Sequence, residues 1–260
     1  MAQQELTVAL AQLKPALRDP QANVARMQAV IAAHPAADLV VFPELFWGGY
    51  TTTDLEALVC DVHGELFAAL AERAAHHRTA VLFGAAEAVD GGFANAAFFI
   101  DRDGRPGGVY RKAQLFGDES AGFVPGDALR LVSVGGHRLG VMICFDVEFP
   151  EVARALARAG ADALVTISAN MTPFGFDHHL FATARAVENG LPHVYVNQVG
   201  EGERFTFTGG SMAVSVDGEL SAEAGGQAEG VTVARLAPAV PSRVRPDYLA
   251  LHRDPPPVSG

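Results

Sequence analysis

The chain has 260 residues, of which 49% are hydrophobic and 19% are charged, and its formal net charge at pH 7 is −11. This length suits one domain with a large core, so we expect residues 1–260 to form a single domain. Nucleic acid and anionic membranes are disfavoured as partners, because the sequence has no basic patch that could displace counterions. Its apolar runs are also shorter than the roughly 20 residues that span a bilayer.

Two features favour a cytoplasmic protein. The first residues, MAQQELTVALAQL, alternate like a strand and lack the basic start of a secretion signal. The two cysteines, Cys60 and Cys144, allow one disulfide at most, and free thiols in an intracellular protein fit this count better. Near the other terminus, the proline-rich residues 253–260 are expected to form a mobile tail.

The first half of the chain alternates predicted strands with two amphipathic helices. Asp19 and Pro20 mark the start of the first helix, because an aspartate caps well and a proline suits the first helical position. Asp103 and Gly104 predict a tight hairpin turn. The predicted strands are 6–13, 39–42, 79–84 and 93–100, and the predicted helices are 19–34 and 64–78.

The second half begins with an irregular segment, 109–127, whose sequence is VYRKAQLFGDESAGFVPGD. Long loops of this kind inside compact domains are usually functional. Strands are predicted at 129–134, 138–143 and 163–167, with one helix starting at 149 and another over 178–189. Three further apolar stretches, HVYVNQV, RFTFTGGSMAVSV and VTVARL, are expected to complete the sheet.

The composition of the strands predicts the fold class. Strands such as VVF, VMIC and LVTI are apolar at nearly every position, which indicates burial on both faces. Helices would cover one face and a second sheet the other. We therefore predict an α/β fold, a four-layer α-β-β-α sandwich, in preference to a single doubly wound sheet.

Cys144 is the candidate nucleophile, because it ends the first strand of a strand–helix–strand unit. The carboxyl edge of a parallel sheet is where open α/β folds place their chemistry. A free cysteine with a pKa near 8.5 is only about 3% thiolate at neutral pH, so it needs a base or a nearby positive charge. The competing interpretation, a cysteine that only fills the core, is the one we assign to Cys60.

Three charged residues are candidates to activate this thiol. Glu44 ends the strand at 39–42 and could take the thiol proton and later return it to a leaving amine. Lys112 opens the irregular segment and could hold an oxyanion together with the backbone N–H of Phe145. Glu119, in the same segment, could orient the lysine or help to deprotonate water. Isolated surface charges are the alternative for each, so the residues alone suggest a cysteine hydrolase without proving it.

Loop residues that could contact a substrate share an aromatic or amide side chain near a strand end. They are Tyr50, Phe116, Asn170 and Phe174. The histidine pairs at 76–77 and 178–179 are adjacent in sequence and do not share one helix face, whereas a metal site such as HExxH uses a spacing of i, i+4. We therefore expect no metal.

Three motifs resemble those of the nitrilase superfamily of carbon–nitrogen hydrolases. They are VVFPE around Glu44, YRKAQLF around Lys112 and ICFDVEFPEVAR around Cys144, and they occur in the family order. ESAGFVPGD resembles the loop that carries the second glutamate of the family, here Glu119. RVRPDYLALHRDP, residues 243–255, resembles the C-terminal tail, so the likeness extends over essentially the whole chain.

The resemblance implies an α-β-β-α sandwich that uses no cofactor and acts on a small amide. Cys144 would attack the amide carbonyl while Glu44 serves as base and then as acid, and Lys112 and the Phe145 N–H would stabilise the oxyanion. Ammonia would leave, and water would hydrolyse the thioester. Members of the family commonly dimerise through the helices after the cysteine and the C-terminal tail, so a homodimer or higher homo-oligomer is implied.

Glu148 departs from the family pattern, which often has an arginine four residues after the cysteine, and this leaves local structure and substrate shape open. The CFD context resembles amidases and carbamoylases more than nitrilases, so an amidase is expected. The alternative is an N-carbamoyl-amine or amino-acid amidohydrolase, and a nitrilase, an acyltransferase and a non-catalytic binding homologue are less favoured. Arg111 and Arg204 are the candidates for binding a substrate carboxylate.

Overall fold

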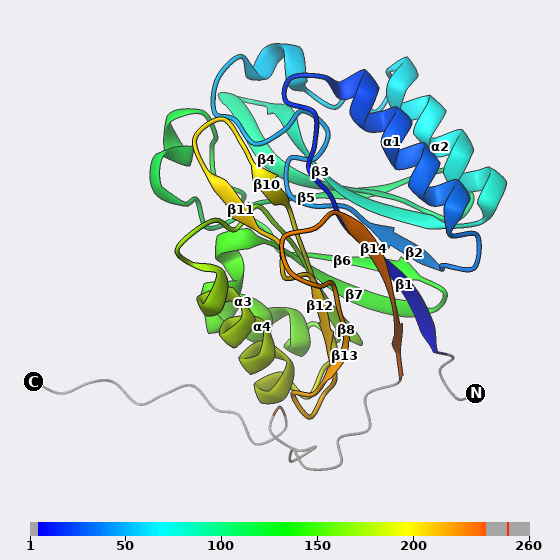
Figure 1. Cartoon of the computed structure of the whole chain (residues 1–260), viewed down its shortest axis with the longest axis vertical. Coiled ribbons are helices and arrows are strands. Elements are labelled where there is room, and N and C mark those ends of the chain that lie inside the picture. Colours follow the sequence, from blue (N-terminus) through cyan, green and yellow to red (C-terminus); the bar gives the residue numbers. More distant parts are fainter. Residues whose placement is uncertain (1–4, 238–248, 250–260) are drawn as a thin grey trace, which may run out of the picture.

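The computed structural model describes residues 5–237 and Leu249, and two six-stranded sheets form its centre (Figure 1). The strands of the first sheet are β1 (Leu6–Gln12), β2 (Leu39–Val41), β3 (Ala80–Val89), β4 (Gly92–Ile100), β5 (Pro106–Arg111) and β14 (Gly230–Leu236). Those of the second are β6 (Arg130–Val134), β7 (His137–Ile143), β8 (Ala163–Ser168), β9 (His193–Asn197), β12 (Met212–Val214) and β13 (Leu220–Glu223). The spatial orders are β14-β1-β2-β3-β4-β5 and β13-β12-β9-β8-β7-β6.

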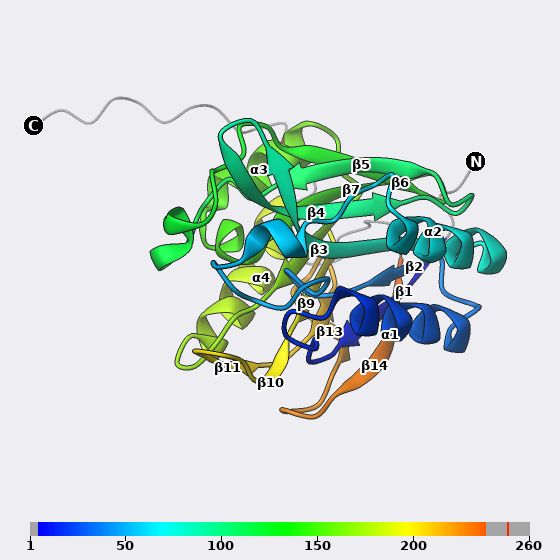
Figure 2. The ribbon, with the colours of Figure 1, turned by 90° about the horizontal axis from the view of Figure 1, so that it is seen from above.

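Within residues 5–237, four α-helices cover the outer faces of the two sheets. They are α1 (Pro20–Ala33), α2 (Glu65–His77), α3 (Pro150–Arg158) and α4 (Gly175–Asn189). Seen from above, α1 and α2 lie on one side of the stacked sheets and α3 and α4 on the other (Figure 2). One apolar core fills the space between the sheets, and a separate core lies under each helix pair. The predicted four-layer α-β-β-α sandwich is therefore confirmed.

Local sequence signals were reliable guides to element boundaries. The carboxylate of Asp19 accepts a hydrogen bond from the Ala22 N–H at 2.9 Å, and α1 begins at Pro20 as predicted. β4 and β5 form the antiparallel hairpin expected from Asp103 and Gly104. In the middle of the chain, β7, α3 and β8 form the predicted parallel strand–helix–strand unit.

Two expectations about the last strands were wrong. RFTFTGGSMAVSV is not one strand, because Gly209 and Gly210 adopt φ values of +62° and +71°, which end extended structure. The residues before them form β11 (Thr206–Thr208), which pairs with β10 (Val199–Glu201) in a separate two-stranded sheet. VTVARL does not join β12 and β13; it lies in β14, antiparallel to β1 of the first sheet.

The remaining expectations concern the start of α4, the two cysteines, membrane-spanning helices and the C-terminal segment. The helix α4 starts at Gly175, three residues before its predicted start. Both cysteines are free and buried. No helix in the described part of the chain is long and apolar enough to cross a membrane. The tail-like motif at 243–255 and the expected mobile tail at 253–260 lie outside the described residues, apart from Leu249.

Candidate active site

Glu44 lies in a tight bend that follows β2. The next residue, Leu45, has a φ of 48°, in the left-handed region that is costly for a branched side chain. The bend passes so close to β3 that a Cβ on Gly84 would lie 2.2 Å from the Leu45 nitrogen and 2.6 Å from the Glu44 Cα. Only glycine allows this approach. The result is a carboxylate side chain with no exposed surface.

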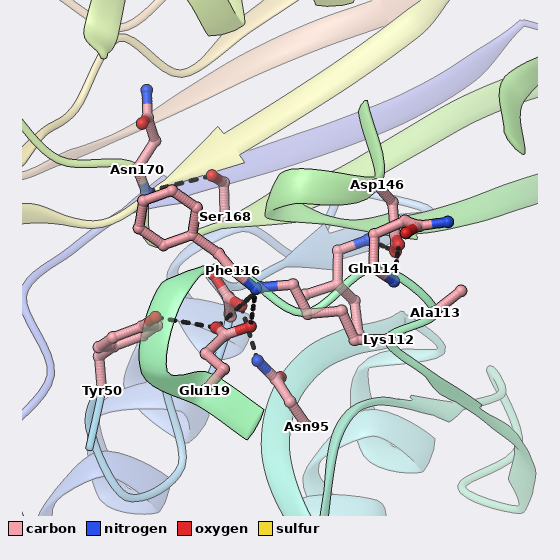
Figure 3. A network of polar contacts seen from close by, with 12 residues as sticks. Tyr50, Asn95, Lys112, Ala113, Gln114, Phe116, Glu119, Asp146, Ser168 and Asn170 are labelled. Carbon is pink, nitrogen blue, oxygen red and sulfur yellow. Dashed lines mark hydrogen bonds and ion pairs between the residues drawn. The ribbon is translucent and has the colours of Figure 1, made fainter. Parts of the chain in front are cut away.

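Lys112 joins this carboxylate to a second one (Figure 3). Its Nζ donates to Glu44 Oε1 at 2.7 Å and to Glu119 Oε1 at 2.8 Å, and all three side chains are fully buried. Asn95 Nδ2 donates to the same Glu44 oxygen at 2.7 Å. Glu119 is held in turn by the Tyr50 hydroxyl and the Phe116 N–H, both at 2.8 Å. The structure thus brings together the three charged residues that the sequence singled out.

Burial and mutual charge shift the pKa values in this group. Burial raises the pKa of Glu44, Lys112 counteracts it, and the charge of Glu119 adds to the rise. Burial alone would lower the pKa of Lys112, but Glu44 and Glu119 outweigh it and hold that pKa well above its ordinary value. Lys112 therefore stays charged between its two carboxylates.

Cys144 begins a 3₁₀ turn, Cys144–Glu148, directly after β7. Its φ of 45° is left-handed, and such strain costs about 1–3 kcal/mol and gathers at functional sites. Burial raises the pKa of the thiol, Glu44 raises it further, and Lys112 and a hydrogen bond with Ser168 act in the opposite direction. The nucleophile candidate therefore lies within reach of the charges of the buried group, as a neutral thiol at rest.

Asp146 fastens this turn to the strand and loop that carry the lysine. Its Oδ2 accepts from the Ile143 N–H at 2.9 Å and from the Tyr110 hydroxyl at 2.7 Å, and its Oδ1 accepts from the Gln114 N–H at 2.9 Å. No role was predicted for Asp146. Its place in CFD, two residues after the cysteine, could have indicated a role. Its hydrogen-bond partners, however, can be identified only in the folded structure.

A narrow pocket that opens to solvent leads to Cys144. All four predicted contact residues line it: Tyr50, Phe116, Asn170 and Phe174. Four more residues line it: Phe145, Glu148, Met171 and His178. Phe145 was predicted as the oxyanion donor and Glu148 as the departure that bears on substrate shape, whereas Met171 and His178 were not predicted to line the pocket. Phe116 packs edge-on against Phe145 and Phe174, with ring centroids 5.3 and 5.9 Å apart, which makes one wall aromatic.

The two candidate carboxylate-binding arginines are directed elsewhere. Arg111 forms a two-bond ion pair with Glu87, at 2.7 and 3.0 Å. Arg204 pairs with Asp118 at the surface and does not line the pocket. Within residues 5–237 no group of three or more histidine, cysteine, aspartate or glutamate side chains is placed to hold a metal ion.

The sequence and the fold match one family. A family model described as carbon-nitrogen hydrolase matches residues 7–245. The chain belongs to the carbon-nitrogen hydrolase family. An (R)-stereoselective amidase of a Pseudomonas species is 36% identical over 226 residues, covering 85% of this chain and 81% of the relative. A formamidase of Pseudomonas syringae pv. tomato is 30% identical, covering 90% of this chain and 72% of the relative.

Solved structures agree with this assignment to the carbon-nitrogen hydrolases. An amidase from Nesterenkonia sp. superposes with a TM-score of 0.85 at 30% identity, covering 97% of this chain and 94% of the other. The resemblance to the nitrilase superfamily, inferred from three motifs, is therefore confirmed. The likeness extends through both sheets and both helix layers.

Proposed function

We propose that this carbon-nitrogen hydrolase is an amidase, which cleaves a small amide and releases ammonia through a thioester on Cys144. The observation that carries the proposal is the buried Glu44–Lys112–Glu119 group beside the thiol at the base of a narrow pocket. A cysteine-to-alanine mutant of the Nesterenkonia amidase is found in complex with butyramide, and a glutamate-to-glutamine mutant carries the acetamide moiety of fluoroacetamide on its active-site cysteine.

Glu44 is the proposed proton carrier. Its Oε1 is occupied by Lys112 and Asn95, whereas its buried Oε2 has no hydrogen-bond partner among the described residues. A burial-raised pKa makes this carboxylate a better proton acceptor than an exposed one. As the sulfur bonds to the amide carbon, the thiol proton passes to Glu44. Glu44 then gives this proton to the amide nitrogen as the C–N bond breaks, so that ammonia leaves and the thioester remains on Cys144.

Lys112 is the proposed oxyanion donor, together with the Phe145 N–H. An ammonium has three donors, and the two carboxylates occupy two of them, which leaves one for the tetrahedral intermediate. Removing one such donor typically costs about 3–4 kcal/mol of transition-state stabilisation. Glu119 keeps the lysine in place and is the proposed helper in activating the water that hydrolyses the thioester.

Four pocket residues, Tyr50, Phe116, Asn170 and Phe174, are proposed to contact the substrate. The narrow aromatic wall supports a small amide over a bulky one. An N-carbamoyl amine is the second candidate, because the same nucleophile could attack the carbonyl of a ureido group.

Ammonia release over a panel of small amides, carbamoyl amines and nitriles tests this function. Wild-type protein is expected to release ammonia from amides, and Cys144→Ala is expected to release none. Cys60→Ala is the matched control, because Cys60 is equally free but lies in the core under α1 and α2, and it should retain activity. Release that survives in Cys144→Ala would exclude this nucleophile.

Three further statements belong to the same proposal. Residues 1–260 would act as one catalytic domain, which the shared core between the sheets supports. The protein would be a cytoplasmic one, in keeping with its two free thiols. It would form a homodimer, in keeping with the exposed apolar side chains of Phe176 and Leu180 on α4, which are 75% and 53% exposed.

A further inference from the structure

Glu148, the residue that departs from the family pattern, lines the same pocket as Cys144. It ends the 3₁₀ turn that carries the nucleophile, and its side chain is 28% exposed. Apart from Cys144 and His178, the other residues that line the pocket have no ionisable side chain except the Tyr50 phenol, which donates to Glu119. A carboxylate therefore faces the space where the rest of a bound amide would lie.

A hydrogen bond from His178 holds this carboxylate in position. His178 Nε2 lies 3.3 Å from Glu148 Oε1, and His178 Nδ1 lies 3.0 Å from the Tyr195 hydroxyl, so the ring is held at both nitrogens. Since a carboxylate can only accept, Nε2 is the donor in this pair. This contact occupies Oε1, and 28% of the side chain remains exposed, so the carboxylate can accept a further hydrogen bond at Oε2.

The backbone beneath Glu148 is clamped as well. Arg185 donates to the carbonyl oxygens of Val147 and Glu148 at 2.9 and 3.0 Å, and to Glu188 Oε1 at 2.9 Å. The guanidinium is thereby engaged by two carbonyls and a second carboxylate. Arg185 does not line the pocket, and its guanidinium is already bonded to these three oxygens.

Apart from the Lys112 donor assigned to the oxyanion, no lysine or arginine side chain of the described residues is placed to bind a substrate carboxylate in the pocket. Lys112 lies between two carboxylates, and the lining contains no arginine or lysine. Arg111 and Arg204 are paired with Glu87 and Asp118. A substrate carboxylate would meet Glu148 without a counter-charge, and like charges in a partly buried site repel strongly.

We propose that Glu148 is a specificity residue, which favours amides that carry an ammonium group next to the carboxamide and rejects those that carry a carboxylate there. This inference rests on the proposed amidase function and names its substrate class. An ammonium would donate to Oε2 in a charge-assisted hydrogen bond. The aromatic wall formed by Phe116, Phe145 and Phe174 tolerates a cation, since ring faces attract positive charge.

Three amides of matched shape test the proposal at pH 7: alaninamide with an ammonium, isobutyramide with a methyl group and methylmalonamate with a carboxylate. Wild-type kcat/KM is expected to fall in this order. Glu148→Gln keeps the shape and removes the charge, so it should lower the alaninamide-to-isobutyramide ratio by about tenfold or more. The control Glu151→Gln, an exposed glutamate of α3 outside the pocket, should leave the ratio unchanged.

Several results would overturn the proposal while leaving the amidase function intact. One is Cys144-dependent isobutyramide hydrolysis with an equal or lower wild-type rate on alaninamide. Another is a ratio that Glu148→Gln does not change. If no amide is hydrolysed, the amidase function fails, and calorimetry on Cys144→Ala still decides the inference. Alaninamide should then bind Cys144→Ala more tightly than isobutyramide, and adding Glu148→Gln should remove the difference; equal binding would refute it.

Discussion

Three fully buried charges share one small volume around Lys112. Taking a lysine and two carboxylates out of water is costly, and only close pairing offsets that cost. The single ammonium bridges Glu44 and Glu119 at 2.7 and 2.8 Å, so the arrangement depends on all three members at once. The same dependence links stability to catalysis, because the residue that would hold the oxyanion also keeps two like charges apart.

Lys112→Ala is therefore expected to lose stability as well as activity. The substitution leaves Glu44 and Glu119 buried without a counter-charge, and breaking a buried pair in this way typically costs about 3–5 kcal/mol. Urea denaturation measures the loss. Combining Lys112→Ala with Glu44→Gln and Glu119→Gln removes the repulsion and should recover much of the stability. If it recovers none, the loss comes from packing alone.

At the scale of elements, helix caps and strand ends could be predicted from the sequence, because they depend on neighbouring residues. The pairing of strands that are distant in the sequence could not. The cap at Asp19 and the strand that ends directly before Cys144 could be predicted, because a side chain and its immediate sequence context determine them. The pairing of β14 with β1 was not readable, since its apolar alternation is compatible with either sheet. Likewise, the motifs identified Glu44 and Lys112, but Asp146 and His178 gain their roles only from folded partners.

Gly84 in β3 allows the bend that carries Glu44 to pass close to this strand. In Gly84→Ala, the new Cβ would lie 2.2 Å from the Leu45 nitrogen, so the bend must move. We expect a stability loss of about 1–3 kcal/mol from overpacking and a larger fall in kcat, because Glu44 is displaced with its backbone. Thermal melting and steady-state kinetics measure the two effects.

Gly230→Ala in β14 is the matched control, since a Cβ there would meet nothing within 4 Å. It should change neither quantity appreciably. A Gly84→Ala protein with wild-type kcat would show that the position of Glu44 tolerates the shift.

At the scale of the whole molecule, several large apolar side chains near the pocket are not covered by the described residues. Three lie at the start of α4: Phe174, Phe176 and Leu180, with 37%, 75% and 53% of their surface exposed. Where large apolar side chains are exposed close to one another, they usually mark an interaction site. Because Phe174 also lines the pocket, contact between two copies here would affect the entrance to the active site.

The full chain is expected to behave as a dimer in light scattering, and Phe176→Ser combined with Leu180→Ser should shift it towards monomer. Val233→Thr is the control, because Val233 is 47% exposed but lies on β14 in the other sheet. A monomeric wild-type protein, or a double variant that remains dimeric, would show that this surface is not the interface.

The pairing of β14 with β1 also has a consequence for biosynthesis. The first sheet contains β1 to β5 from the early part of the chain, yet its outer edge is closed only by residues 230–236. During translation, β1 therefore presents unpaired N–H and C=O groups until nearly the whole described chain has left the ribosome, and such open edges recruit other strands. A chain cut short before residue 230 would keep that edge permanently open, so it would be prone to self-association.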